Sequence, residues 1–241
     1  MKLKYFLKEE LAGWRRWEAL WLMTACAVIL ALSVYWHDTL MGIISATTGV
    51  ACVVCTGKGK LSAYIFGAVN TLLYAIIAYQ TRFYGEVMLN GLYYFPMQFY
   101  GIYVWSRNMN PETHEVVKRE MKPRGKMVLL GIVAAATVCY GLILREMGGL
   151  LPFVDALSTV VSVVAMVVSI RMYAEQWVLW IVVDVVTVIM WGFAFARGSD
   201  SMATLLMWIV YLGNAVIMYF KWIREAKQAK SERQEVKQDA V

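Results

Sequence analysis

Long apolar runs separated by short polar breaks dominate this chain. Eight of these runs approach the roughly 20 residues that a helix needs to cross a bilayer. They cover residues 18–36, 40–56, 60–80, 84–105, 126–145, 150–170, 174–195 and 201–222. The breaks carry glycine and charge, as in GKGK at 57–60 and ARGSDS at 196–201. The pattern predicts an all-α membrane protein with eight transmembrane helices.

Composition supports a membrane protein, because 60% of the residues are hydrophobic and only 17% are charged. The net charge of +6 does not indicate nucleic-acid binding, since the basic residues lie between apolar runs and not on a polar face. The four cysteines all fall inside apolar runs, which is typical of packing. We therefore expect no metal site, no catalytic residues and no cofactor.

The distribution of basic residues predicts the orientation. Of the 23 Lys and Arg residues, only Arg82, Arg145 and Arg197 lie in the breaks on the side opposite the termini. Because basic loops stay in the cytoplasm, both termini are expected there. Leucines at helical spacing in residues 3–11 also predict a short interfacial helix before the first span.

The two halves of the chain look related. At a shift of 114 residues, Phe66 aligns with Trp180 and Asn70 aligns with Asp184. Three helices, a linking helix and three more helices would form two parallel repeats, a known transporter design with the substrate site near the midplane between them. The predicted parts are residues 1–39 (interfacial segment and first helix), 40–105 (first repeat), 106–145 (cytoplasmic loop and linking helix), 146–222 (second repeat) and 223–241 (charged cytoplasmic tail).

Polar side chains inside the spans are the candidate site, because burying them in a membrane is costly. Asp184 lies near the middle of its run, and Trp177 and Trp180 precede it on the same helical face. No Lys or Arg lies deep in any run, so Asp184 must be protonated, hydrated or paired with a cationic ligand. The predicted substrate-binding residues are Asn70, Asn90, Tyr94, Gln98, Trp177, Trp180, Asp184, Tyr211 and Asn214.

Helix packing is the alternative for these amides and tyrosines, which often join membrane helices. Packing also explains Glu86 and Asp155, which lie nearer the ends of their helices. We expect Pro96 to kink its helix between Tyr94 and Gln98, where the bend could serve alternating access.

The segments YGIYVWSRN (100–108) and YAEQWVLWIVVDVV (173–186) resemble the PnuC nicotinamide riboside transporters, and the resemblance spans about residues 40–222. It implies a SWEET-like fold and facilitated diffusion of nicotinamide riboside across the bacterial inner membrane. A cytoplasmic riboside kinase would then trap the substrate. The chain has Ile102 where the family commonly has Trp, and Gln176 where it often has Asn. These departures leave thiamine or riboflavin open as substrates.

Other functions stay open at this point. A SWEET-like sugar carrier would explain the amides but not the carboxylate, and a proton-coupled transporter would use Asp184 as its proton site. A membrane enzyme is disfavoured, because motifs such as H-E-x-x-H and G-x-S-x-G do not occur. A purely structural membrane protein is a further alternative. The apolar surface allows a homo-oligomer without requiring one.

Overall fold

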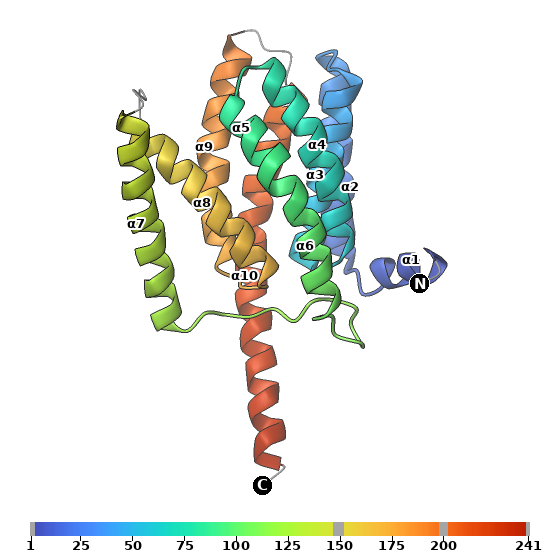
Figure 1. The fold of residues 1–241 in the computed structure, drawn as a ribbon. Coiled ribbons are helices and arrows are strands. Elements are labelled where there is room, and N and C mark those ends of the chain that lie inside the picture. The colour runs from blue at the N-terminus through green and yellow to red at the C-terminus, as the bar shows by residue number, and fades with distance from the viewer. Residues whose placement is uncertain (1–2, 147–151, 198–201, 240–241) are drawn as a thin grey trace. The chain divides into compact units, whose positions relative to one another are not determined.

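The computed structural model of the chain describes residues 3–146, 152–197 and 202–239 (Figure 1). The described residues form helices, their connections and two isolated β-bridges. The helices are α1 (Leu3–Leu11), α2 (Arg16–Tyr35), α3 (Leu40–Lys58), α4 (Ser62–Gln80), α5 (Tyr84–Met88), the π-helix η1 (Leu89–Tyr94), α6 (Phe95–Ser106), α7 (Pro123–Glu146), α8 (Pro152–Ile170), α9 (Gln176–Ala196) and α10 (Met202–Asp239). The all-α prediction is confirmed.

Among the described residues, six helices are long and apolar enough to cross a membrane: α2, α3, α4, α7, α9 and the Met202–Ser231 part of α10. The expected span at 84–105 consists of three consecutive pieces, α5, η1 and α6. The expected span at 150–170 contains the shorter apolar helix Ala156–Ile170, and its first two residues lie outside the described part. The chain is therefore a multi-pass membrane protein.

The helices group into two compact units. Unit 1 comprises Met1–Val117 and Thr187–Ala215, and unit 2 comprises Lys118–Val186 and Val216–Val241. The chain passes from one unit to the other within α9 and within α10.

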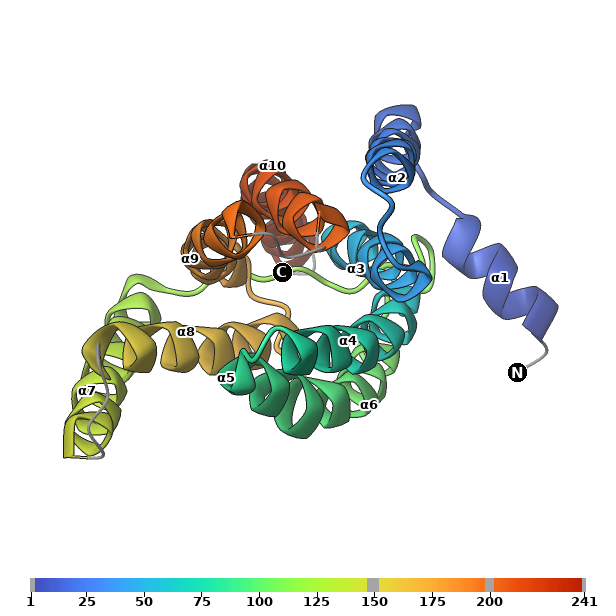
Figure 2. The ribbon, with the colours of Figure 1, turned by 90° about the horizontal axis from the view of Figure 1, so that it is seen from above.

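In unit 1, α3 and α4 pack along their lengths, α2 packs on α3, and α4 also contacts α5, η1 and α6 (Figure 2). Glycines permit this close packing. A Cβ atom on Gly67 would overlap the Gln98 side chain, and one on Gly101 would overlap the Tyr64 ring. The α3–α4 turn is short because Gly59 ends α3 with a φ of 87°, in the left-handed region.

The segment around Pro96 departs from the expected simple kink. Pro96 has no backbone N–H, and its ring crowds the carbonyl four residues earlier. The preceding turn widens into η1, and the Phe95 N–H donates to the Asn90 carbonyl, five residues back. The irregular turn thus lies before Pro96, and π-helical turns of this kind occur frequently at functional sites.

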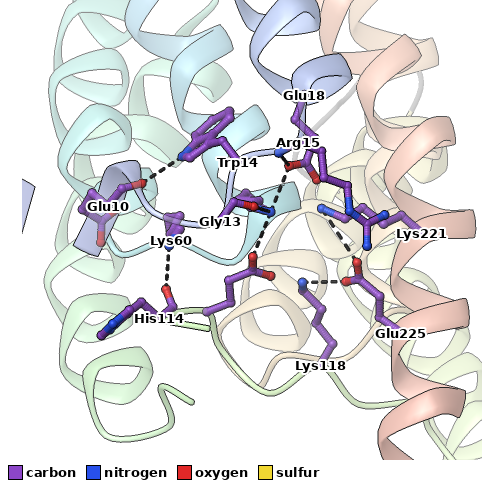
Figure 3. Close-up of polar contacts among 12 residues, drawn as sticks. Glu10, Gly13, Trp14, Arg15, Glu18, Lys60, His114, Lys118, Lys221 and Glu225 are labelled. Atoms are coloured by element: carbon purple, nitrogen blue, oxygen red, sulfur yellow. Dashed lines mark hydrogen bonds and ion pairs between the residues drawn. The ribbon is translucent and has the colours of Figure 1, made fainter. Parts of the chain in front are cut away.

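A buried ionic cluster joins the N-terminal segment to the C-terminal end of α3 (Figure 3). The Lys58 ammonium lies 2.9 Å from a carboxylate oxygen of Glu18 and 2.9 Å from one of Glu115. Lys60 donates to the backbone carbonyls of Glu9 and His114, at 2.8 and 3.0 Å. We call Lys58, Glu18 and Glu115 the Lys58 cluster. It holds α2 and the loop after α6 against the C-terminal end of α3, and Lys60 holds α1 against the same turn.

In unit 2, α7 and α8 pack together, and the Phe153 ring lies directly against Gly141. The polar segment before α7 is tied to the turn before α9. Glu175 accepts from the Met121 N–H at 3.2 Å and pairs with Lys126 at 3.0 Å. Helix α10 continues to Asp239, so the charged tail is helical (Figure 1).

Candidate functional site

The predicted site residues are buried, except Trp180, which is half-buried. Three of them belong to unit 2: Trp177, Trp180 and Asp184. The other six belong to unit 1: Asn70, Asn90, Tyr94, Gln98, Tyr211 and Asn214.

Asn70 is the centre of a polar contact in unit 1. Its Nδ2 donates to the Ser45 carbonyl at 2.8 Å, and its Oδ1 accepts from the Tyr211 hydroxyl at 3.4 Å. The Met207 sulfur lies 3.4 Å from the same Nδ2. A Cβ atom on Gly49 would overlap Tyr211, Asn70 and Met207, so glycine makes room for this contact. Helices α3, α4 and α10 therefore meet around one amide.

Aromatic rings extend from this contact. Trp208 packs edge-on against Tyr211, with centroids 5.0 Å apart, and against Tyr74 at 5.8 Å. The Tyr74 hydroxyl accepts from Trp191 Nε1 at 2.7 Å, and Phe83 packs edge-on against the Trp191 ring at 5.2 Å. Unit 1 thus contains a continuous series of aromatic contacts, and some of these rings carry hydroxyl or indole N–H groups.

The face from η1 to α6 carries a further set of polar groups. Asn90 Nδ2 donates to the Glu86 carbonyl at 2.9 Å and to the Glu86 carboxylate at 3.1 Å. Tyr94 and Gln98 follow on α6 and its preceding turn, both buried. Within the described part of the chain, the structure records no hydrogen bond to the Gln98 amide. That amide can therefore serve a ligand.

Asn214 has the contacts of a packing residue. It is fully buried, its Oδ1 accepts from Trp21 Nε1 at 3.3 Å, and its Nδ2 donates to the Val53 carbonyl at 3.1 Å. The amide thereby joins α2, α3 and α10. These contacts favour the alternative of interhelical packing for this one residue.

In unit 2, Trp177, Trp180 and Asp184 lie on successive turns of α9. Asp184 is 2% exposed, and the structure records no hydrogen bond or ion pair to it among the described residues. Trp177 packs edge-on against Trp222 with centroids 5.8 Å apart. Unit 2 thus holds a buried carboxylate one helical turn after Trp180, and this carboxylate has no charge partner among the described residues.

Two further polar residues with low exposure, one in each unit, lie outside the predicted site set. Glu86 was assigned to packing, yet its spacing of four residues from Asn90 already placed both on one face. Gln176 is completely buried, and neither amide atom has a partner among the described residues. Nothing in the sequence indicated that Gln176 is buried, because it is the first residue of α9 and polar residues at helix ends are usually exposed.

The two units offer these groups separately: unit 2 has a carboxylate and indole faces, which suit a flat cation, and unit 1 has amides and hydroxyls, which suit hydroxyl and amide groups. Indole faces attract cations, carboxylates balance their charge, and amides bond hydroxyls and carbonyls. Within the described ranges, no group of three or more His, Cys, Asp or Glu side chains is placed to hold a metal ion.

Comparison with known proteins identifies the family. Residues 39–224 match the family model described as nicotinamide mononucleotide transporter. The nicotinamide riboside transporter PnuC of Neisseria mucosa is 37% identical over 233 residues, which is 95% of this chain and 89% of the relative. PnuC of Haemophilus influenzae is 31% identical, over 95% and 99% of the two chains.

A solved structure agrees. The crystal structure of the vitamin B3 transporter PnuC superimposes with a TM-score of 0.84 at 36% identity, covering 93% of this chain and 98% of the other. These relatives are transporters and not enzymes, which confirms the predicted class. The match covers both units and all nine predicted site positions. This chain belongs to the nicotinamide mononucleotide transporter family, the family of the PnuC proteins.

Proposed function

We propose that this protein carries nicotinamide riboside across the membrane by facilitated diffusion. The observation that supports this most directly is Asp184, a buried carboxylate that has no partner among the described residues and shares a helix face with Trp180. A pyridinium ring with a permanent positive charge satisfies both groups, by stacking on the indole and by balancing the carboxylate. The names of the curated relatives point to the same substrate.

The riboside fits the candidate residues better than the mononucleotide in the family's description. A phosphate carries about two negative charges and needs Arg, Lys or backbone N–H groups to bind it. The nine predicted residues include no Lys or Arg, and they include one carboxylate, which would repel the phosphate. We therefore expect the riboside to bind and the mononucleotide to bind weakly or not at all.

We assign the individual roles as follows. Trp180 stacks on the pyridinium ring, Asp184 offsets its charge, and Trp177 supports the indole face. The amides of Asn70, Asn90 and Gln98 bond the carboxamide and the ribose hydroxyls. Tyr94 and Tyr211 contribute aromatic rings and hydroxyls to the site, and Asn214 acts through the helices that it joins.

The topology that we propose has eight spans, with α8 and the segment α5–η1–α6 added to the six long apolar helices. The spans 40–105 and 146–222 form two parallel repeats, joined by 106–145. Residues 1–39 precede them and the tail 223–241 follows. The scarcity of Lys and Arg on one side supports cytoplasmic termini in the bacterial inner membrane.

Facilitated diffusion gives net uptake only while the free substrate is less concentrated inside the cell than outside. We propose that a cytoplasmic riboside kinase phosphorylates the substrate and traps it, so no ion gradient is required. Exposed apolar side chains on the spans, such as Leu92 and Phe220, are compatible with lipid contact or with a homo-oligomer.

Isothermal titration of the detergent-purified protein tests the substrate. The probes are nicotinamide riboside, the mononucleotide, thiamine, riboflavin and glucose, each with the parent protein and with Asp184→Asn. Saturable binding of the riboside alone, weakened by Asp184→Asn, is the expected result. The matched control is Glu146→Gln, which removes an exposed carboxylate that pairs with its neighbour Arg145.

Each rival has its own outcome. Binding of thiamine or riboflavin instead of the riboside would identify that vitamin as the substrate, and binding of glucose would favour a sugar carrier. In proteoliposomes, uptake that collapses when the pH gradient and membrane potential are dissipated would favour proton coupling at Asp184. No binding of any probe, with a folded protein, would refute the proposed function.

A further inference from the structure

Glu86 is a carboxylate of unit 1 at the start of the segment 84–105, which we propose as a span. It lies on α5, one turn before Asn90, in the irregular segment that precedes Pro96. Asn90 Nδ2 donates to both its carbonyl and its carboxylate. The Tyr74 hydroxyl of α4 also interacts with the carboxylate. Both partners are neutral, so they orient the carboxylate without cancelling its charge.

Among the described residues, no positive side chain pairs with Glu86. The structure gives it no ion pair with a Lys or Arg of the described ranges. Arg82 and Arg197, the two arginines of unit 1 in the breaks opposite the termini, are exposed. The undescribed residues 147–151 and 198–201 contain no Lys or Arg. A carboxylate held only by neutral donors at the edge of a membrane segment still attracts a cation.

The surroundings of Glu86 are aromatic. Tyr74 and Trp191 are buried and bonded to each other at 2.7 Å, and Phe83 packs on Trp191. Glu86 itself is only partly buried, unlike Tyr74, at 1% exposure. Its carboxylate lies at the Tyr74 hydroxyl, at the edge of this aromatic cluster. Aromatic rings beside a carboxylate are the combination that recognises organic cations.

We propose that Glu86 is a specificity-determining residue that selects for the positive charge of the substrate, in addition to Asp184. The inference rests on the proposed function and on the proposed orientation, which places Glu86 toward the outer side. A flat organic cation would meet this carboxylate on entry. Neutral analogues of the same shape would lack the attraction, and anionic ones would be repelled.

The test compares two ligands that differ in charge. Oxidised nicotinamide riboside is a cation, and its 1,4-dihydro form has nearly the same shape but is neutral. Affinities of both are measured by titration for the parent, Glu86→Gln and the control Glu146→Gln. We expect Glu86→Gln to lower the affinity for the cation by roughly tenfold, the size of one partly screened ion pair. Affinity for the dihydro form should change little.

A packing role would predict another result. Gln has the volume of Glu and keeps an acceptor for Asn90, so a structural residue would leave the ratio of the two affinities unchanged. That unchanged ratio would overturn the inference. If Glu86→Gln does not purify as a monodisperse protein, Glu86→Met provides a second neutral variant for the same ratio.

The inference and the proposed function fail differently. If the parent binds neither form of the riboside, the proposed substrate is wrong and the charge selectivity of Glu86 falls with it. If the parent binds and prefers the cation, and both Glu86 variants keep that preference, only the role of Glu86 is refuted.

Discussion

Replacing Lys58 by methionine should destabilise the protein strongly. Methionine has a similar length and no charge, so the change removes the ammonium from the Lys58 cluster while it retains most of the packing. Glu18 is 1% exposed and Lys58 is 4% exposed, so water cannot replace the lost partner. The substitution leaves a buried carboxylate without its cation.

The magnitude follows from the burial of the pair. Removing one partner of a buried salt bridge costs about 3–5 kcal/mol, because the remaining charge stays desolvated. Glu18 keeps the Arg15 backbone N–H as a donor at 2.9 Å, which favours the lower part of that range. For a chain of this size, 1 kcal/mol corresponds to roughly 2–4 °C in melting temperature. We expect a decrease of about 6–15 °C from these two scales.

Thermal unfolding in detergent, followed by tryptophan fluorescence, provides the assay. The control is Lys8→Met, which removes an exposed lysine from α1 and should change stability by no more than about 0.5 kcal/mol. The double variant Lys58→Met with Glu18→Gln should recover much of the loss, because no buried charge of Glu18 remains. Equal melting temperatures for Lys58→Met and Lys8→Met, or no recovery in the double variant, would refute the reasoning.

Three other substitutions test the interior. Gly49→Ala should lower stability by about 1–3 kcal/mol in the same thermal assay, because its methyl group would overlap the Tyr211 hydroxyl. Tyr74→Phe leaves the buried Trp191 indole N–H unpaired and should cost about 1–3 kcal/mol; an unchanged melting temperature would show that the 2.7 Å bond adds little. Gln176→Met should leave the melting temperature unchanged or raise it, since neither amide atom has a partner among the described residues; a loss of riboside affinity in titration would add Gln176 to the site.

Local sequence patterns predicted the helices well and the long-range contacts poorly. The ends of α3 and α4 are marked by Thr39, Gly59 and the charged turn between them, so their bounds could be read directly. The Lys58 cluster could not, because Glu18 and Glu115 are far from Lys58 in sequence and approach it only after folding. The same applies to the bond between Trp21 and Asn214, which are 193 residues apart.

The widened turn at η1 was missed for another reason. Pro96 indicated a disturbed helix, but proline alone does not decide between a kink and a π-helical turn. That choice depends on how α5, η1 and α6 pack against α4, where Gly67 admits the Gln98 side chain. Sequence therefore located the irregularity within a turn and left its form to tertiary packing.

The predicted polar residues differ in whether their side chains already have hydrogen-bond partners within the protein. Asn214 has both amide atoms bonded within the protein, so a substrate would have to break existing bonds to use it. Gln98 and Asp184 have no such bonds among the described residues, and burying them costs free energy that a ligand can recover. This difference gives binding a measurable consequence, because a ligand at 100 times its Kd stabilises the folded state by about 2.7 kcal/mol. If only the side chains without internal partners bind the ligand, the stabilisation that the ligand gives should be smaller in Gln98 and Asp184 variants than in the parent. It should persist in an Asn214 variant that has lost intrinsic stability.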